Sequence, residues 1–244
     1  MRFYYSNLVA LMPGVTSADD WSKVIETDLL PESEVVPPCP VPVMVRRRMT
    51  ALGRLALTAL AQISPEAEES VVYASSWGEI GRTAQLVGDV AADPQAMSPA
   101  GFSSSVHNAI AGIASIWQKN HAAGPAVTAG TLTTEAALVQ CAARLAAGAR
   151  SVILLRYDEP LPELWQTREH RYSAPSRMFA WAMRLMSDPE SAEGSFALDV
   201  LGETQADVDE VQCRNCPADL FFLLGKMTSR VHTDYSSRGY RWVR

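Results

Sequence analysis

The sequence has few cysteines, few histidines and no excess of positive charge. Its 244 residues include 4 cysteines and 4 histidines, and the formal net charge is -6. Four cysteines are too few for a disulfide framework in a chain of this length, so we expect reduced thiols. The acidic balance lacks the basic surface of a nucleic-acid-binding protein. These absences exclude a disulfide-rich secreted domain and argue against a nucleic-acid partner.

Long apolar runs are also missing. The first 21 residues contain one arginine and a short apolar run that is interrupted by Ser6, Asn7 and Pro13, unlike a signal peptide. No other run approaches the roughly 20 apolar residues needed to cross a bilayer. Hydrophobic residues make up 48% of the chain and charged residues 20%, an ordinary globular composition. We therefore expect one domain over residues 1–244, without an integral membrane segment and located in the cytoplasm.

Cofactor and metal motifs are absent as well. The sequence contains no Gly-x-Gly-x-x-Gly turn and no P-loop, so nothing indicates a nucleotide cofactor. Cys213 and Cys216 form a Cys-x-x-Cys pair, but no second Cys or His pair follows at the spacing of a zinc site. We predict neither a metal nor a cofactor, and a redox role for this pair stays open.

The hydrophobic pattern indicates an α/β protein. Apolar residues recur every three or four positions from residue 46 to residue 63, which predicts a helix. The pattern predicts a strand at 126–130, a helix at 133–147 and a strand at 151–157. In such a unit the two strands most simply lie parallel in one sheet. Further predicted elements are strands at 3–11, 71–77 and 195–202, and helices at 107–117, 175–187 and 217–229.

Three ordered blocks resemble β-ketoacyl synthases. Residues 98–116 open with Ser-Pro, continue to an Asn and have a Gly four positions later, as a ketosynthase segment does. Residues 71–81 are similar to the strand and glycine bend of that family, and residues 46–60 to its first long helix. The resemblance covers about residues 1–165, and residues 166–244 are a divergent, reduced carboxy-terminal part.

This resemblance implies a thiolase-like fold, a mixed central sheet with flanking helices. The wording Phe-Ser-x-Ser-Val-His-Asn-Ala, from Phe102, is typical of short β-ketoacyl synthase-like chain-length factors found with aryl polyene or related polyketide gene sets. In an active ketosynthase a cysteine nucleophile stands at the start of a helix, where backbone N–H groups favour the thiolate. Counting back from Gly148 places that position at Thr131, or at Gly130 if the turn differs by one residue.

The resemblance therefore implies a subunit without catalysis. Cys141 falls inside the predicted helix and reads as a core thiol, and the pair of catalytic histidines is missing because His170 and His232 lack the family's context. The expected role is a chain-length factor that pairs with an active β-ketoacyl synthase and meets the acyl carrier protein only indirectly. The residues expected at the partner interface or its acyl tunnel are Ser98, Phe102, Ser104, Ser105, His107, Asn108 and Trp117.

Other interpretations stay open. Thr131 or His107 could serve a decarboxylase or acyltransferase that uses a residual pocket, although a threonine needs an activating base. Arg46, Arg47 and Arg48 could attract an acidic carrier protein, but short basic runs are more often solvated. Asp158 and Glu159 resemble acid–base carboxylates, but their place before Pro160 favours a turn. A third possibility is an unrelated α/β module that binds an acyl or nucleotide ligand.

Overall fold

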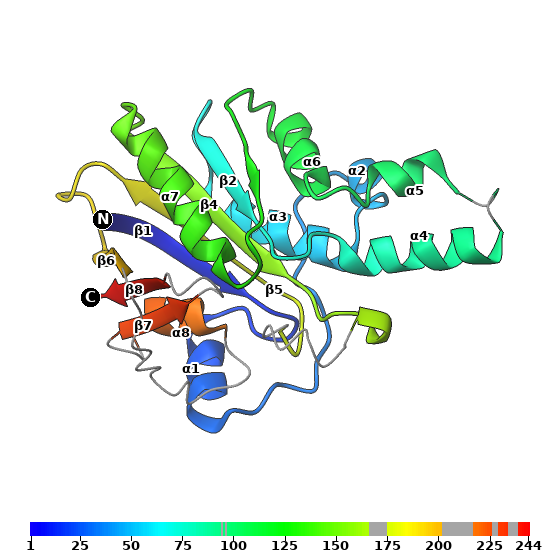
Figure 1. Cartoon of the computed structure of the whole chain (residues 1–244), viewed down its shortest axis with the longest axis horizontal. Coiled ribbons are helices and arrows are strands. Elements are labelled where there is room, and N and C mark those ends of the chain that lie inside the picture. The colour runs from blue at the N-terminus through cyan, green and yellow to red at the C-terminus, as the bar shows by residue number, and fades with distance from the viewer. Residues whose placement is uncertain (94, 96, 166–174, 202–216, 226–228, 234–238) are drawn as a thin grey trace.

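The chain is built around one mixed β-sheet (Figure 1). The computed structural model describes residues 1–93, 95, 97–165, 175–201, 217–225, 229–233 and 239–244. The strands in these ranges form an eight-stranded sheet in the order β3-β2-β4-β5-β1-β6-β8-β7. Their bounds are β1 Arg2–Leu11, β2 Ser70–Ala74, β3 Ala126–Val127, β4 Ser151–Asp158, β5 Phe179–Met186, β6 Gly194–Leu201, β7 Ser229–Thr233 and β8 Gly239–Val243.

Parallel pairing is confined to one end of this sheet. Strand β2 pairs parallel with β3 and with β4, whereas the other neighbouring strands pair antiparallel. The predicted strand, helix and strand unit is thus present as β3, α7 and β4, with β2 lying between the two strands. The parallel pairing predicted for this unit is present in β2, β3 and β4, and the mixed sheet that the family resemblance implied is confirmed.

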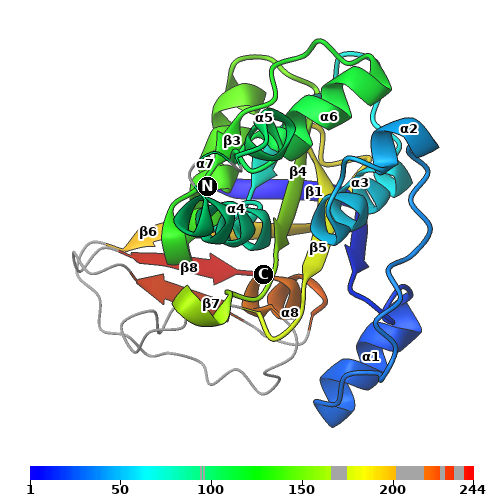
Figure 2. The same cartoon turned by 90° about the vertical axis from the view of Figure 1, so that its right-hand side faces the viewer.

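Helices cover both faces of the sheet (Figure 2). Helix α3 packs on one face, against β1, β4 and β5, and α7 packs on the other, against β2 and β4. The helical bounds are α1 Ala18–Thr27, α2 Val43–Arg46, α3 Ala51–Ile63, α4 Ile80–Ala92, α5 Pro99–Ser103, α6 Ala109–Gln118, α7 Thr133–Ala146 and α8 Ala218–Leu223, with 3-10 turns η1 Gly130–Leu132 and η2 Glu163–Trp165.

The alternation of side chains along β4 explains why two cores form. Val152 and Leu154 point into the cluster beneath α7, whereas Ile153 and Leu155 point into the cluster beneath α3. Successive side chains of a strand leave opposite faces of the sheet, so a strand that is apolar at every position is buried on both. The continuous apolar run of this segment therefore belongs to a central strand, as predicted.

The sequence also specifies where α3 begins and ends. The hydroxyl oxygen of Thr50 accepts a hydrogen bond from Gly53 N at 3.0 Å, which satisfies one of the unpaired N–H groups of the first turn. Ser64 then takes a left-handed conformation and Pro65 follows, so the helix cannot continue. This helix matches the predicted one, except that its regular part starts at Ala51 rather than at residue 46.

Three predicted elements are wrong. Residues 175–187 do not form a helix, because Phe179–Met186 is the strand β5, paired on both sides by β4 and β1. The predicted helix 217–229 is shorter, since α8 ends at Leu223 and β7 begins at Ser229. The segment expected as a bend and loop after Gly78 instead contains the thirteen-residue helix α4.

Within the described residues, no helix is long and apolar enough to cross a membrane. The longest helices, α3, α4 and α7, have 13 or 14 residues each.

Candidate functional site

The carboxyl ends of β2, β3 and β4 lie together on the same side of the sheet, where the three strands end. The segments that leave these ends are Ser75–Gly78 after β2, Thr128–Leu132 after β3, and Asp158–Glu159 at the end of β4. Ser76 connects two of them, because its Oγ donates to Gly130 O at 3.1 Å while Asp158 Oδ1 accepts from its N at 3.0 Å. In α/β folds, reactive and ligand-binding groups gather at such strand ends.

Thr131 lies in the 3-10 turn that enters α7. Gly130 has φ +57°, a left-handed conformation that favours glycine. Thr133 holds the turn, because its Oγ1 donates to Gly130 O at 2.7 Å and accepts from Ala129 N at 3.0 Å. Thr131 itself is half-buried. The turn before α7 therefore carries the hydroxyl of Thr131 and is stabilised by the hydroxyl of Thr133, and it contains no thiol.

A buried ion pair is connected to this turn through Ser76. Arg156 forms a salt bridge with Asp158, and both side chains are at least nine-tenths buried. Arg156 also donates to Ser76 Oγ at 3.0 Å and to Thr134 Oγ1 at 3.2 Å. Thr134 in turn donates to Asp219 Oδ2 at 2.7 Å. The polar groups at these carboxyl ends of the strands thus bond with one another, and they join β2, β4, α7 and α8 into one network.

The cysteines that the structure describes are core residues. Cys141 is fully buried in α7, eight positions after its first residue, and burial raises the pKa of its thiol. Cys39 is buried in the cluster beneath α3. The Cys213 and Cys216 pair and His170 lie outside the described residues, as does the side chain of His232. Among the described residues, no three His, Cys, Asp or Glu side chains are arranged to hold a metal ion.

The predicted interface residues fall into two groups. Ser98, Ser104 and Ser105 shape α5 locally, since Ser98 Oγ accepts from Gly101 N at 3.3 Å and the other two hydroxyls donate to main-chain oxygens at 2.9 Å. Phe102 and Asn108 are exposed, and Phe102 retains 55% of its accessible surface. These residues lie in or beside α5 and just before α6, and α4 and α5 project from the sheet as an arm (Figure 1).

His107 and Trp117 face inward instead. His107 Nε2 lies 2.9 Å from Ser75 O, and a Cβ at Gly78, where φ is +61°, would lie 3.1 Å from His107 Cδ2. This close approach fixes the arm to the end of β2. Trp117 is half-buried and packs against the cluster beneath α3. The structure therefore brings Phe102 and Asn108 to the surface and uses His107 and Trp117 for packing.

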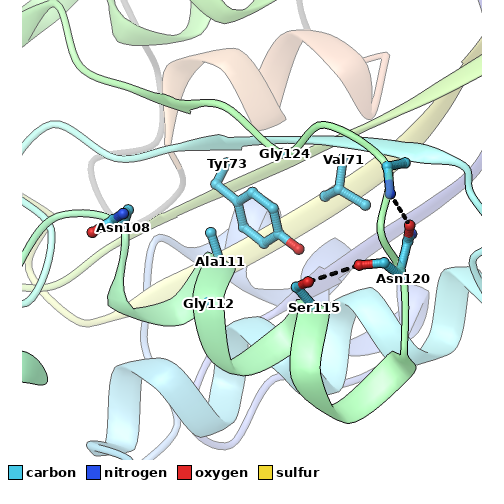
Figure 3. A pocket seen from close by; sticks show the side chains of 9 residues that line it. Val71, Tyr73, Asn108, Ala111, Gly112, Ser115, Asn120 and Gly124 are labelled. Carbon is cyan, nitrogen blue, oxygen red and sulfur yellow. Dashed lines mark hydrogen bonds between the residues drawn. The ribbon is translucent and has the colours of Figure 1, made fainter.

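A small pocket opens beside this arm, between α6 and β2 (Figure 3). Its volume is about 220 Å³. The side chain of Tyr73 extends along the pocket, and its hydroxyl points toward Ser115 on α6. Ser115 Oγ donates to Asn120 O at 2.7 Å, which fixes the loop that forms the far wall. The pocket is lined by Val71, Tyr73, Asn108, Ala111, Gly112, Ser115, Asn120, Ala122 and Gly124.

One buried carboxylate at the base of the arm, Glu79, escaped the sequence interpretation. Glu79 is 4% exposed, and its Oε2 has no hydrogen-bond partner among the residues described. Burial raises its pKa to about 7, and nearby Glu159 adds to the shift, while Thr50 and Arg82 oppose it. Glu159 is half-buried and accepts from Gly81 N, in the first turn of α4, at 2.8 Å. Glu79 gave no sequence signal, because its burial comes from α3, which lies earlier in the chain.

Comparison with known proteins places this architecture in a family. A family model described as "Beta-ketoacyl synthase, N-terminal domain" matches residues 19–243. The chain belongs to the β-ketoacyl synthase family. The likeness proposed from residues 46–60, 71–81 and 98–116 is thereby confirmed. No curated protein sequence matches the chain significantly.

Solved structures of ketosynthases share the fold. One is a ketosynthase (ApeO) in complex with its chain length factor (ApeC) from Xenorhabdus doucetiae, with TM-score 0.78, 22% identity and 100% of both chains covered. A second is the ishigamide ketosynthase/chain length factor, with TM-score 0.63 and 16% identity, covering 82% of this chain and 67% of that one. A third holds a type II polyketide synthase acyl-carrier protein with its ketosynthase, with TM-score 0.62 and 13% identity, covering 81% and 68%.

Proposed function

We propose that the chain is a non-catalytic chain-length factor, which pairs with a cysteine-bearing β-ketoacyl synthase and shapes the acyl tunnel of that partner. The observation that carries this proposal is the turn that enters α7. It presents Thr131 where the family resemblance calls for a cysteine, and the neighbouring hydroxyls of Ser76 and Thr133 are bonded to Gly130 O. Acyl transfer requires a nucleophile that is free and activated.

No activating base is bonded to Thr131 within the part of the chain whose side chains the structure describes. A threonine hydroxyl is a weak nucleophile unless an adjacent base takes its proton. Among the described side chains, no histidine forms a hydrogen bond with Thr131, Ser76 or Thr133. His107 directs Nε2 to Ser75 O instead. This arrangement favours a partner subunit over the alternative of a stand-alone decarboxylase or acyltransferase.

The surface around β3 is suited to a protein partner. Among the strands that the structure describes, β3 lies at the edge of the sheet and pairs with β2 alone. Large apolar side chains on α5 and α6 are exposed, including Phe102 at 55% and Ile116 at 77%. An open strand edge and exposed apolar side chains are both features of interaction surfaces. Ketosynthases pair across their central sheets, so we assign this surface to the ketosynthase partner.

The relatives support the same assignment. The complex from Xenorhabdus doucetiae contains a chain that the present one covers over its full length. The ishigamide structure contains a longer chain, of which 67% is covered. A short ketosynthase-like subunit therefore occurs within a complex described as a ketosynthase with its chain length factor. By analogy, the present chain would contact an acyl carrier protein only through its partner.

Phe102 is the side chain best placed to limit product length. It stands out from α5 with more than half of its surface exposed, so a partner can enclose its ring. A bulky ring at the end of a closely packed acyl tunnel leaves no volume for a further two-carbon unit. Replacing the ring by a methyl group would lengthen the tunnel and relax the limit.

The test is co-expression with a ketosynthase from the same genome, with one subunit tagged, followed by co-purification and an elongation assay. We expect a stable heterodimer whose products lengthen when Phe102→Ala is introduced. Leu29→Ala is the matched control, because Leu29 is 71% exposed but lies beyond α1, away from the arm. Failure to co-purify, or elongation by the isolated chain, would contradict the proposal.

A further inference from the structure

We propose that the pocket between α6 and β2 receives one aromatic side chain of the partner ketosynthase, carried on an extended segment that lies along β3. This inference rests on the proposed function and adds to it the position and chemistry of a main anchoring contact. The open edge of β3, the size and lining of the pocket, and the rigid wall of the pocket support this assignment.

Strand β3 offers main-chain groups to such a segment. Tyr73 N donates to Pro125 O at 2.9 Å and Ser75 N donates to Val127 O at 3.2 Å. Because the main-chain groups of a strand alternate in direction, those of Ala126 point away from β2. An extended peptide that joins such an edge gains affinity from main-chain hydrogen bonds and specificity from pockets that accept its side chains. The pocket lies beside this edge, because Ala122 and Gly124 of its lining directly precede β3.

The size of the pocket suits a side chain better than a small-molecule ligand. Its volume of about 220 Å³ lies below the roughly 300–1,000 Å³ of typical small-molecule sites. Its lining combines apolar groups of Val71, Ala111 and the Tyr73 ring with polar groups of Asn108 and Ser115. An aromatic side chain with a polar end matches this mixture, and aromatic residues seated in pockets dominate the binding energy of many interfaces.

The wall of the pocket is already rigid. Asn120 is buried, its Nδ2 donates to Glu69 O at 2.8 Å, and its Oδ1 accepts from Ala122 N at 2.8 Å. Together with the bond from Ser115, these contacts fix the loop between α6 and β3 on the end of the sheet. A preformed wall reduces the ordering cost of binding.

Two glycines keep the pocket open. On α6 the residues Asn108, Ala111, Gly112 and Ser115 share one helical face and line the pocket. A Cβ at Gly112 would meet no atom within 4 Å, so a larger side chain there can extend into the pocket without displacing the chain's own atoms. At Gly124 a Cβ would instead lie 3.1 Å from Tyr73 Cε2, which makes Gly112 the better position for a test.

The test fills the pocket from Gly112. Gly112→Ala, Gly112→Leu and a matched control, Gly88→Leu, are compared in binding to the immobilised ketosynthase subunit. Gly88 is also an exposed helical glycine with nothing within 4 Å of an added Cβ, and leucine favours helix at both positions. We expect Gly112→Leu to raise the dissociation constant roughly 30-fold or more, the loss of one anchoring contact. Gly112→Ala should have a much smaller effect, and Gly88→Leu none.

The outcomes separate this inference from the function on which it rests. If the wild-type chain binds the ketosynthase and Gly112→Leu binds as Gly88→Leu does, the pocket is not the anchor and the subunit role stands. If the wild-type chain does not bind the ketosynthase at all, the proposed function itself is wrong, and the anchoring contact with it. Amide hydrogen exchange gives a readout that needs no variant: residues 120–127 should exchange more slowly in the heterodimer, and unchanged exchange would overturn the inference.

Discussion

Replacing the buried Glu79 by glutamine should stabilise the protein at neutral and alkaline pH. Glu79 lies between α4 and the start of α3, with Glu159 and Arg82 as its charged neighbours. Its Oε2 has no hydrogen-bond partner among the described residues. An ionised carboxylate in such a place loses hydration that the protein does not replace, so the folded state favours the protonated form.

The magnitude follows from the pKa. The folded state raises the pKa of Glu79 from 4.5 to about 7, so the folded protein binds this proton more tightly than the unfolded chain does. The resulting stabilisation is fully present below pH 4.5 and is lost as the pH rises through about 7. Each pKa unit corresponds to about 1.4 kcal/mol, so the loss amounts to about 3 kcal/mol. Glutamine does not titrate, and Glu79→Gln should therefore gain about this much over the wild type between pH 4.5 and pH 8.

Urea denaturation of both proteins between pH 4.5 and 8, at one protein concentration, measures this difference. Glu69→Gln provides a control with the opposite sign. Burial raises the pKa of Glu69, but hydrogen bonds from Arg184 and Ser151 outweigh burial and hold it below its usual value. Its linked stability is thus present above its unfolded pKa and is lost at more acidic pH. If the stability difference between Glu79→Gln and the wild type is the same at pH 5 and pH 8, Glu79 is not a destabilising buried carboxylate and the reasoning is refuted.

Two further predictions concern the strand ends around Thr131. Thr131→Ala should leave the rate and product length of the ketosynthase complex unchanged in the elongation assay, because the proposed function gives this hydroxyl no chemical role; a loss of activity would favour the enzyme alternative. Arg156→Met should cost about 3–5 kcal/mol of unfolding free energy in urea denaturation, since it leaves the buried carboxylate of Asp158 without its counter-charge. A cost below about 1 kcal/mol, the value of an exposed pair, would contradict the buried network.

The elements that could be predicted are those with a clear hydrophobic period. Helices α3 and α7 and strand β4 lie where the sequence indicated, because α7 buries one face, α3 buries most of its residues and β4 buries both faces. Strand β5 was mistaken for a helix, since its run Phe-Ala-Trp-Ala-Met-Arg-Leu-Met combines helix-forming residues with apolar groups at nearly every position. Pairing with β1 and β4 on both sides overrides that local preference.

Helix α4 was not predicted, because its sequence lacks a strong helix propensity. Glycines at 81 and 88 weaken its helix propensity, and Ile80 is the residue it buries. A helix that packs so little of itself against the sheet carries a weak sequence signal. The same weak packing leaves apolar groups such as Val87 exposed.

Only the part of the candidate site that lies within one short segment could be predicted from the sequence. The family resemblance, counted back from Gly148, placed the nucleophile position at Thr131 or Gly130, and both residues lie in the 3-10 turn before α7. The network behind that turn joins Ser76, Thr134, Arg156 and Asp219, which come from four separate segments and approach only in the folded sheet. No local pattern could have connected them, and the same holds for the burial of Glu79 by α3.

The distribution of bonded and unbonded groups favours binding over reaction. At the strand ends, where an enzyme needs groups free to meet a substrate, the side chains of Ser76 and Arg156 form hydrogen bonds with other parts of the chain. At the sheet edge the opposite holds: no other described strand pairs with the outer side of β3, Phe102 is exposed on α5, and a rigid pocket opens between α6 and β2. Free energy is available from a contact only where groups are not already satisfied. Changes at Thr131 should therefore be silent, whereas changes at Phe102 or Gly112 should alter the product or the pairing.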